Sequence, residues 1–172
     1  MTGLRIRGAT AADAEGCAAV YRPYVTDSCI SFEYEPPTAE DFAGRIAASH
    51  AWLVAEDEGR IVGYAYASRH RDRAAYDWAA DVAIYTDASH HGRGMGRRLY
   101  EELFPRLRAA GLRVLCAGIA LPNDASEGLH RALGFEDVGV YRRIGWKGGR
   151  WHDVRWLQLH LGDDAPPATV QG

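Results

Sequence analysis

The sequence predicts one α/β domain built on a mixed, twisted β-sheet of about seven strands, flanked by about four helices. Two observations lead to this fold class. Segments typical of strands alternate with apolar patterns of helical period, in the order strand, two helices, three strands, helix, strand, helix, two strands. A mixed sheet with helices on both faces buries such a series. The chain has 172 residues, 47% of them hydrophobic and 25% charged, which is typical of a globular protein with one core.

The first half of the chain begins with an alternating strand and two helices. We expect a strand over 4–7, a helix over 11–21, a largely irregular stretch over 22–37, a helix over 38–49, strands over 52–56 and 61–68, and a long strand over 76–86. Thr38 is the expected N-cap of the second helix, with Asp41 as its partner three residues on. Gly59 is expected at a positive φ in the turn between the next two strands.

The second half continues with a helix that buries every fourth residue from Met95 to Leu107. Pro105 lies inside this pattern, where it can kink the last turns. The remaining elements are expected as a helix end near Ala110, a strand over 114–119, a helix ending at 132–134, and strands over 135–146 and 151–161. We expect the domain to cover residues 1–162 and residues 163–172 to form a flexible tail.

Charge and composition exclude several classes of protein. The formal net charge of −3 favours neither nucleic acid nor an anionic membrane surface as a partner. No apolar run reaches about 18 residues, so no membrane span is expected, and the N-terminal residues lack the apolar core of a signal peptide. Cys17, Cys29 and Cys116 are odd in number and far apart, which predicts neither a disulfide framework nor a zinc ribbon. A reducing cytoplasm is the expected compartment.

A glycine-rich turn between a β-branched strand and an amphipathic helix is the most informative stretch. Gly92, Gly94 and Gly96 let the backbone approach a ligand, and the helix directs its free N–H groups into the turn. These features predict a site for phosphate oxygens, although glycines also serve plain tight turns. A Walker loop would need Gly-Lys-Ser/Thr, where Arg97 and Arg98 stand instead. A dinucleotide fingerprint would need a Gly-x-Gly-x-x-Gly spacing, which is absent.

The turn resembles the acetyl-CoA pyrophosphate loop of the GNAT acetyltransferase superfamily, Gln/Arg-x-x-Gly-x-Gly/Ala. His91 stands where that family usually has Gln or Arg. The order of elements also matches the GNAT fold. Four longer segments resemble the phosphinothricin acetyltransferases and the related methionine sulfoximine and sulfone acetyltransferases. These segments, at residues 32–38, 73–78, 121–135 and 145–154, extend the resemblance over nearly the whole domain.

The resemblance implies that acetyl-CoA is the co-substrate. Main-chain N–H groups of the loop would bind its pyrophosphate, and the preceding strand would pair with the pantetheine arm. The residues implied are Val82, Ala83, Ile84, His91, Gly92, Arg93, Gly94, Met95, Gly96, Arg97, Asn123 and Ser126. Asn123 and Ser126 also suit the cap of the helix that follows them, and the two roles are compatible.

Two residues are candidates for catalysis by resemblance. Asp81 occupies the position at which the family usually has Glu as the base for the ammonium group of the acceptor. Because Asp is shorter by one carbon–carbon bond, about 1.5 Å, we expect it to act through a water. An ordinary carboxylate in the strand is the alternative. His130 matches a histidine that has been suggested to assist catalysis in the phosphinothricin acetyltransferases. A helix histidine packed against the sheet is its alternative.

The acceptor site is expected around Arg73 and Tyr76, because a planar guanidinium suits a carboxylate or phosphinate. A solvated loop arginine is the alternative for Arg73. Further residues of the acceptor pocket or of a subunit contact are Phe32, Glu33, Lys147, Trp151 and His152, although Trp151 also suits a core position. No metal site is expected, since the adjacent His90 and His91 do not project together and lack an acidic partner at a suitable spacing.

The sequence thus predicts an acetyl-CoA-dependent N-acetyltransferase. Its acceptor would be the α-amino group of a small amino-acid-like molecule of the phosphinothricin or methionine sulfoximine type, consistent with a detoxification or resistance role. Direct transfer in a ternary complex is expected, because no cysteine lies in a motif position. A homodimer is expected by resemblance. Two alternatives stay open: another amine as acceptor, such as a protein N-terminus, an antibiotic or a polyamine, and a CoA-binding sensor domain without catalysis.

Overall fold

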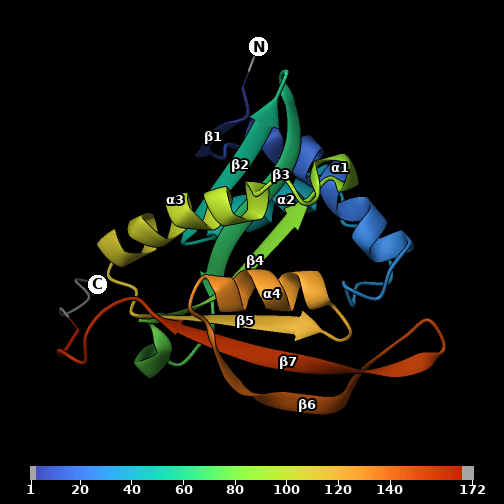
Figure 1. Cartoon of the computed structure of the whole chain (residues 1–172). Coiled ribbons are helices and arrows are strands. Elements are labelled where there is room, and N and C mark those ends of the chain that lie inside the picture. The colour runs from blue at the N-terminus through green and yellow to red at the C-terminus, as the bar shows by residue number, and fades with distance from the viewer. Residues whose placement is uncertain (1–2, 168–172) are drawn as a thin grey trace.

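The computed structural model describes residues 3–167 and contains, within them, a seven-stranded sheet and four α-helices (Figure 1). The order of elements is the predicted one. The elements are β1 (Arg5–Gly8), α1 (Ala14–Thr26), α2 (Ala39–Ala48), β2 (Ala51–Asp57), β3 (Arg60–Arg69), β4 (Ala79–Thr86), α3 (Met95–Ala109), β5 (Val114–Ala120), α4 (Asp124–Ala132), β6 (Glu136–Lys147) and β7 (Arg150–His160).

Three boundaries differ from the expected ones by three residues or more. The helix expected over 11–21 begins as a 3-10 turn and continues as α1 to Thr26, beyond Pro23. The proline lies in the last turn, and its own carbonyl accepts a hydrogen bond from the Asp27 N–H, so the helix ends only there. The long strand expected from Tyr76 begins instead at Ala79, because Ala74–Tyr76 form a 3-10 turn.

Strands follow the order β1-β2-β3-β4-β5-β7-β6 across the sheet. All neighbours are antiparallel except β4 and β5, which are parallel. Their pairing covers three residue pairs and ends at Asp81 and Cys116. β4 continues to Thr86 and β5 to Ala120, and Figure 1 shows the two strands pointing apart. The sheet therefore opens in its middle.

Alternate residues of β2 enter two separate cores. Leu53 and Ala55 of β2 belong to the core that also contains the buried stripe of α3, whereas Trp52 and Val54 pack with the side chains of α1 and α2. Since successive strand residues point to opposite faces, α3 covers one face and α1 and α2 cover the other. The opening between β4 and β5 therefore connects two differently covered faces of the sheet.

Local features confirm two predicted turn and cap residues. The Thr38 side chain accepts a hydrogen bond from the Asp41 N–H, and the Asp41 carboxylate accepts one from the Thr38 N–H, which is a complete capping box. Gly59 has a φ of 78° in the β2–β3 turn. The predicted tail lies partly outside the described residues, at 168–172, and residues 163–167 form neither helix nor strand. Within residues 3–167, no helix is long and apolar enough to cross a membrane.

An ion-pair cluster joins β1, β2 and the start of α1. The Arg7 guanidinium donates to both carboxyl oxygens of Asp13 at 2.8 Å and also to Glu56. The hydrogen bonds from Arg7, with a smaller contribution from the Thr10 N–H, lower the pKa of the buried Asp13 carboxyl to about 2. A lowered pKa in the folded state stabilises the protein above the unfolded-state pKa, and this contribution is lost as the pH falls through the folded-state value.

We predict that Asp13→Asn lowers the free energy of unfolding at pH 7 by about 2 kcal/mol, from the shift of the pKa. The deficit should shrink as the pH falls below about 4, where the wild-type carboxyl starts to lose its advantage. Urea denaturation at several pH values measures this, with Asp163→Asn, whose side chain is largely exposed, as the control. A deficit independent of pH would contradict the assignment.

Candidate active site

A cavity of about 590 Å³ opens where β4 and β5 part. It is lined by both strands, the glycine-rich loop, the first turn of α3 and the inner face of α4. Nearly all residues predicted to bind the co-substrate line it: Val82, Ala83, Ile84, His91, Gly92, Gly94, Met95, Gly96, Arg97, Asn123 and Ser126. Arg93 is the exception; it is exposed and does not line the cavity. The structure thus brings the dispersed motif residues together.

Two glycines of the loop adopt a left-handed conformation. Gly92 and Gly94 each have a φ of 73°, and a Cβ added to either would meet nothing within 4 Å. Here glycine is required by the backbone and leaves open space in front of it. Gly96, inside the first turn of α3, is required by packing, because its Cβ would lie 3.0 Å from Leu129 and 3.3 Å from Ile84.

The N-terminus of α3 is electrostatically unusual. Its first turn contains no acidic residue, whereas Arg97 and Arg98 stand there, next to the positive end of the helix dipole. Positive side chains at this end are unfavourable without an anion nearby. The free N–H groups of the turn and the open space before Gly92 and Gly94 can receive such an anion.

His91 stands at the first position of the loop motif, where the usual residue is Gln or Arg, and it bonds to the end of β4. Its Nε2 lies 3.1 Å from the Thr86 carbonyl oxygen and 3.2 Å from the Tyr24 hydroxyl. Tyr24, from α1, donates to the same carbonyl at 2.6 Å. The histidine and the tyrosine therefore fix the entrance of the loop against the strand.

The other wall of the cavity begins with the cap of α4. The Asn123 side chain accepts a hydrogen bond from the Ser126 N–H at 3.2 Å, so Asn123 is the N-cap that the sequence suggested. The Ser126 carbonyl oxygen lies 2.7 Å from Nδ1 of His130, one turn later. The polar groups of this helix end thus form one connected set along the cavity.

His130 is buried in the floor of the cavity. Its Nδ1 donates to the Ser126 carbonyl, which leaves Nε2 as the acceptor of the bond from the Tyr100 hydroxyl at 3.1 Å. Burial lowers the pKa of His130, so the imidazole is neutral near pH 7. Because both nitrogens already have protein partners, the geometry favours the packed helix histidine over a proton donor.

Asp81 lies at the last paired position of β4 before the opening. Its carboxyl oxygen Oδ1 is 2.5 Å from Nδ1 of His70, the residue that follows β3. Burial raises the pKa of Asp81, and the hydrogen bond from His70 opposes that change. A half-buried carboxyl with a raised pKa is typical of a group that exchanges protons at a functional site.

Cys116 faces Asp81 across the last pair of β4 and β5. Among the described residues, His70, Asp81 and Cys116 form a group whose possible ligand atoms all lie within 4.8 Å of one another. His70 and Asp81 already share one hydrogen bond, which favours a proton-sharing pair over a metal centre. Burial raises the pKa of the Cys116 thiol to about 11, with a further contribution from the Asp81 carboxylate.

Arg73 and Tyr76 lie on the connection between β3 and β4. The guanidinium of Arg73 is exposed and makes no hydrogen bond to another described side chain or carbonyl. The Tyr76 ring packs edge-on against the His70 imidazole, with 5.6 Å between the centroids. Tyr76 is thus linked to Asp81 through His70. Arg69 holds this connection by its ion pair with Asp77.

Three other predicted acceptor residues join the α1–α2 connection to the β6–β7 hairpin. The buried Lys147 ammonium donates to the carbonyls of Val25 and Ser31, both at 2.7 Å. His152 Nε2 bonds to the Lys147 carbonyl at 2.8 Å, and Phe32 packs over the backbone of Gly145. These contacts engage the Lys147 ammonium and one ring nitrogen of His152 and favour a structural role for both residues.

Glu33 and Trp151, the remaining predicted residues, lie elsewhere. Glu33 forms an ion pair with Arg45 of α2. Trp151 is 56% exposed, so the core position left open for it is wrong; it packs edge-on against Trp146 across the hairpin. The hairpin exposes an apolar surface formed by Val138, Val140, Tyr141, Ile144, Trp146 and Trp151.

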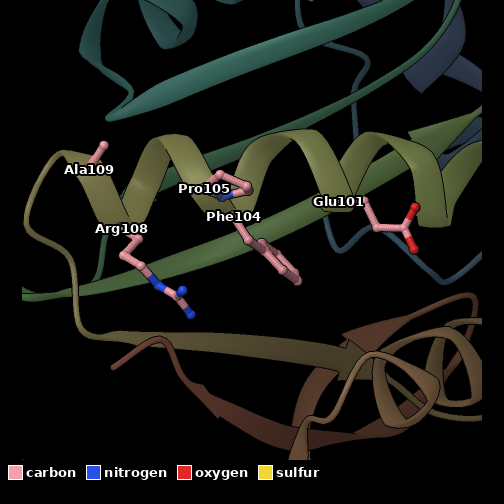
Figure 2. A pocket seen from close by; sticks show the side chains of 5 residues that line it. All are labelled: Glu101, Phe104, Pro105, Arg108 and Ala109. Atoms are coloured by element: carbon pink, nitrogen blue, oxygen red, sulfur yellow. The ribbon is translucent and has the colours of Figure 1, made fainter. Parts of the chain in front are cut away.

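A second, shallower hollow of about 390 Å³ runs along α3. Figure 2 shows its five lining side chains, all from that helix: Glu101, Phe104, Pro105, Arg108 and Ala109. It contains neither the glycine loop nor a polar group converging from another element. The β4–β5 cavity is therefore the candidate active site.

Comparison with known proteins agrees with this geometry. A family model described as an acetyltransferase (GNAT) domain matches residues 6–156. The chain belongs to the GNAT acetyltransferase family. The phosphinothricin N-acetyltransferase of Streptomyces viridochromogenes is 38% identical over 171 residues, which cover 98% of this chain and 93% of that protein.

Other relatives confirm the narrower resemblance and the fold. An L-methionine sulfoximine/L-methionine sulfone acetyltransferase of Pseudomonas paraeruginosa is 35% identical over 161 residues, covering 91% of this chain and 94% of that protein. A similar fold is found in the crystal structure of a GNAT phosphinothricin acetyltransferase from Sinorhizobium meliloti in complex with AcCoA, whose sequence is 36% identical. The match covers 99% of this chain and 95% of that chain, with a TM-score of 0.92. The chain therefore has the GNAT fold.

Several residues of this GNAT site were not predicted from the sequence. The β5 residues Ala117–Ala120 line the cavity opposite β4, and a parallel neighbour of β4 could have been inferred from the intervening helix. The positions of Tyr24 and His70 at the site could not be inferred from the sequence, because each residue reaches the site through a contact with a segment that is distant in sequence.

We predict that Cys116 is alkylated by iodoacetamide on the order of 100 to 1,000 times more slowly at pH 8 than an ordinary thiol, because raising a pKa from about 8.5 lowers the thiolate fraction tenfold per unit. Asp81→Asn should increase the rate by removing a nearby negative charge. Peptide mapping by mass spectrometry measures it, with the urea-unfolded chain as reference. Equal rates in the folded and unfolded chains would contradict the prediction.

Proposed function

We propose that this GNAT acetyltransferase transfers the acetyl group of acetyl-CoA to the α-amino group of a small amino-acid-like acceptor. The phosphinothricin or methionine sulfoximine type is the acceptor class that its named relatives suggest. The observation that carries the proposal is the position of Asp81 and the Arg73–Tyr76 connection beside a cavity that begins where β4 and β5 part. Acetylation of a toxic amino-acid analogue would serve detoxification or resistance.

The cavity supplies the groups that acetyl-CoA needs. N–H groups of Gly92–Gly96 and the dipole of α3 would bind the pyrophosphate. Val82–Ile84 lie on the open edge of β4, where their backbone groups can pair with the pantetheine arm. Asn123 and Ser126 would contact that arm from the start of α4. This arrangement would bring the thioester to the end of the β4–β5 pairing, next to Asp81.

The acceptor would bind on the side of His70 and Tyr76. The exposed Arg73 guanidinium suits the carboxylate or phosphinate of the acceptor, with the Tyr76 hydroxyl as a second donor. Asp81 supplies the negative charge needed to remove a proton from the ammonium group, which must become an amine before it attacks. Direct transfer within a ternary complex follows, since Cys116 is held as a thiol by its raised pKa.

We predict turnover of acetyl-CoA, measured as thiol release, with phosphinothricin, methionine sulfoximine or methionine sulfone, and much less with polyamines. Asp81→Ala should lower kcat by about 10²- to 10⁴-fold, the usual contribution of general base catalysis, while acetyl-CoA binding measured by calorimetry stays intact.

Other outcomes of the same assay would reassign the protein. Turnover restricted to protein N-termini, antibiotics or polyamines would show that the acceptor belongs to that class and not to the amino-acid-like molecules proposed. Tight acetyl-CoA binding without turnover on any amine would favour a CoA sensor and sink the proposal.

A second prediction concerns the glycine loop. Gly94→Ala forces a Cβ into a left-handed backbone, which costs about 1–2 kcal/mol, or makes the loop leave the conformation that binds phosphate. We expect acetyl-CoA to bind about tenfold more weakly, the equivalent of 1.4 kcal/mol. Gly128→Ala in α4 is the matched control, since its added Cβ meets nothing within 4 Å and its φ is ordinary. Equal affinities of the two variants would contradict the role of the loop.

We also propose a homodimer formed through the β6–β7 hairpin. The six exposed large apolar residues on it are between 36% and 61% exposed, an unusual share of apolar surface for one hairpin. Light scattering should give a dimer for the wild type and a monomer for Trp151→Glu, with Arg108→Glu on α3 as the control. A monomeric wild type would refute the interface. We propose the cytoplasm as the compartment, as three free cysteines suggest.

A further inference from the structure

His70 and Asp81 form a hydrogen-bonded pair where the chain passes from β3 to β4. Asp81 faces Ser68 across the β3–β4 pairing, and His70 follows directly after β3, so the chain turns back just there. The imidazole and carboxyl groups lie 2.5 Å apart, with side chains 17% and 29% exposed. Both side chains are thus partly shielded but still accessible.

Hydrogen bonding defines which nitrogen of His70 is available. A carboxylate can only accept, so Nδ1 must donate to Asp81, and in a neutral imidazole Nε2 then carries the free lone pair. Among the described residues, Nε2 has no hydrogen-bond partner, unlike the fully occupied nitrogens of His130. An oriented histidine with a carboxylate behind it is the arrangement that activates a base in hydrolytic triads.

Aromatic neighbours hold the ring in place. Tyr76 packs edge-on against it at 5.6 Å between centroids, and Trp156 does so at 6.3 Å. The other charged or titratable groups around the pair are Arg71, Tyr66 and Cys116. Arg71 is the one cation among these described neighbours, and it favours the ionised carboxylate. The surroundings therefore support a carboxylate that stabilises an imidazolium.

We propose that His70 is the group that accepts the proton from the acceptor's ammonium, at Nε2, with Asp81 orienting the ring and stabilising its charged form. This inference rests on the proposed function. It also explains how the short Asp81 side chain reaches the amine: through the imidazole, where a water was the expected intermediary. Histidine as a class has its ordinary pKa near neutral pH, which suits a general base.

The ammonium gives one proton to Nε2, and the amine forms a bond to the acetyl carbonyl carbon of the thioester. The carbon–sulfur bond then breaks. The nitrogen then loses a second proton, which the leaving thiolate takes up. The products are the amide, the CoA thiol and a protonated His70, which returns its proton to water.

The test compares His70→Gln with His160→Gln, a substitution of an exposed histidine on β7. Glutamine can still bond to Asp81 but cannot accept a proton. We expect His70→Gln to lower kcat by about 10²- to 10⁴-fold, with unchanged acetyl-CoA affinity and without the acidic limb of the wild-type pH profile of kcat. Added imidazole should restore activity to His70→Ala, which a merely structural histidine would not allow.

Several outcomes would overturn the inference. Wild-type kcat and pH profile in His70→Gln, with activity lost in Asp81→Asn, would make Asp81 alone the base and leave the proposed function intact. Loss of wild-type activity with a chelator, restored by Zn²⁺, would assign the cluster to a metal. If the wild type acetylates no amine, the proposed function fails. The tautomer of His70 can still be measured by nitrogen NMR, and a proton on Nε2 at pH 8 would refute the tautomer that the inference requires.

Discussion

The early end of the pairing between β4 and β5 is the constraint on which the site depends. After Asp81 and Cys116 the two strands part, although β4 continues to Thr86 and β5 to Ala120. Backbone N–H and C=O groups along a parted strand need partners, and an elongated ligand with amide groups can supply them. The same parting opens the cavity, and the residues that directly follow the last pair, Val82 and Ala117, line it.

The two faces of the sheet carry different parts of the site. On one side α3 presents its N-terminus and the left-handed glycines 92 and 94, and α4 presents the cap formed by Asn123. On the other side His70, Tyr76 and Trp156 form an aromatic surround for Asp81. A reaction between a thioester and an amine needs both reactants held at one point. The end of the β4–β5 pairing is the point at which the two sides meet.

The sequence could predict elements whose signals are local. The order of strands and helices, the capping box of Thr38 and the glycine loop all depend on short-range periodicity or on residue types at fixed spacing. Contacts between distant segments could not be predicted in this way. Lys147 was expected near the acceptor, yet its ammonium holds the α1–α2 connection in place. His70 had no predicted role, because nothing in its sequence neighbourhood indicates that β4 brings Asp81 beside it.

The most direct test of this account is a crystal structure of the protein with acetyl-CoA bound. The account predicts pyrophosphate oxygens on the N–H groups of Gly92–Gly96 and the pantetheine arm along Val82–Ile84, with the thioester beside the His70–Asp81 pair. A co-substrate bound elsewhere, such as the hollow along α3, or a thioester remote from Asp81, would contradict it.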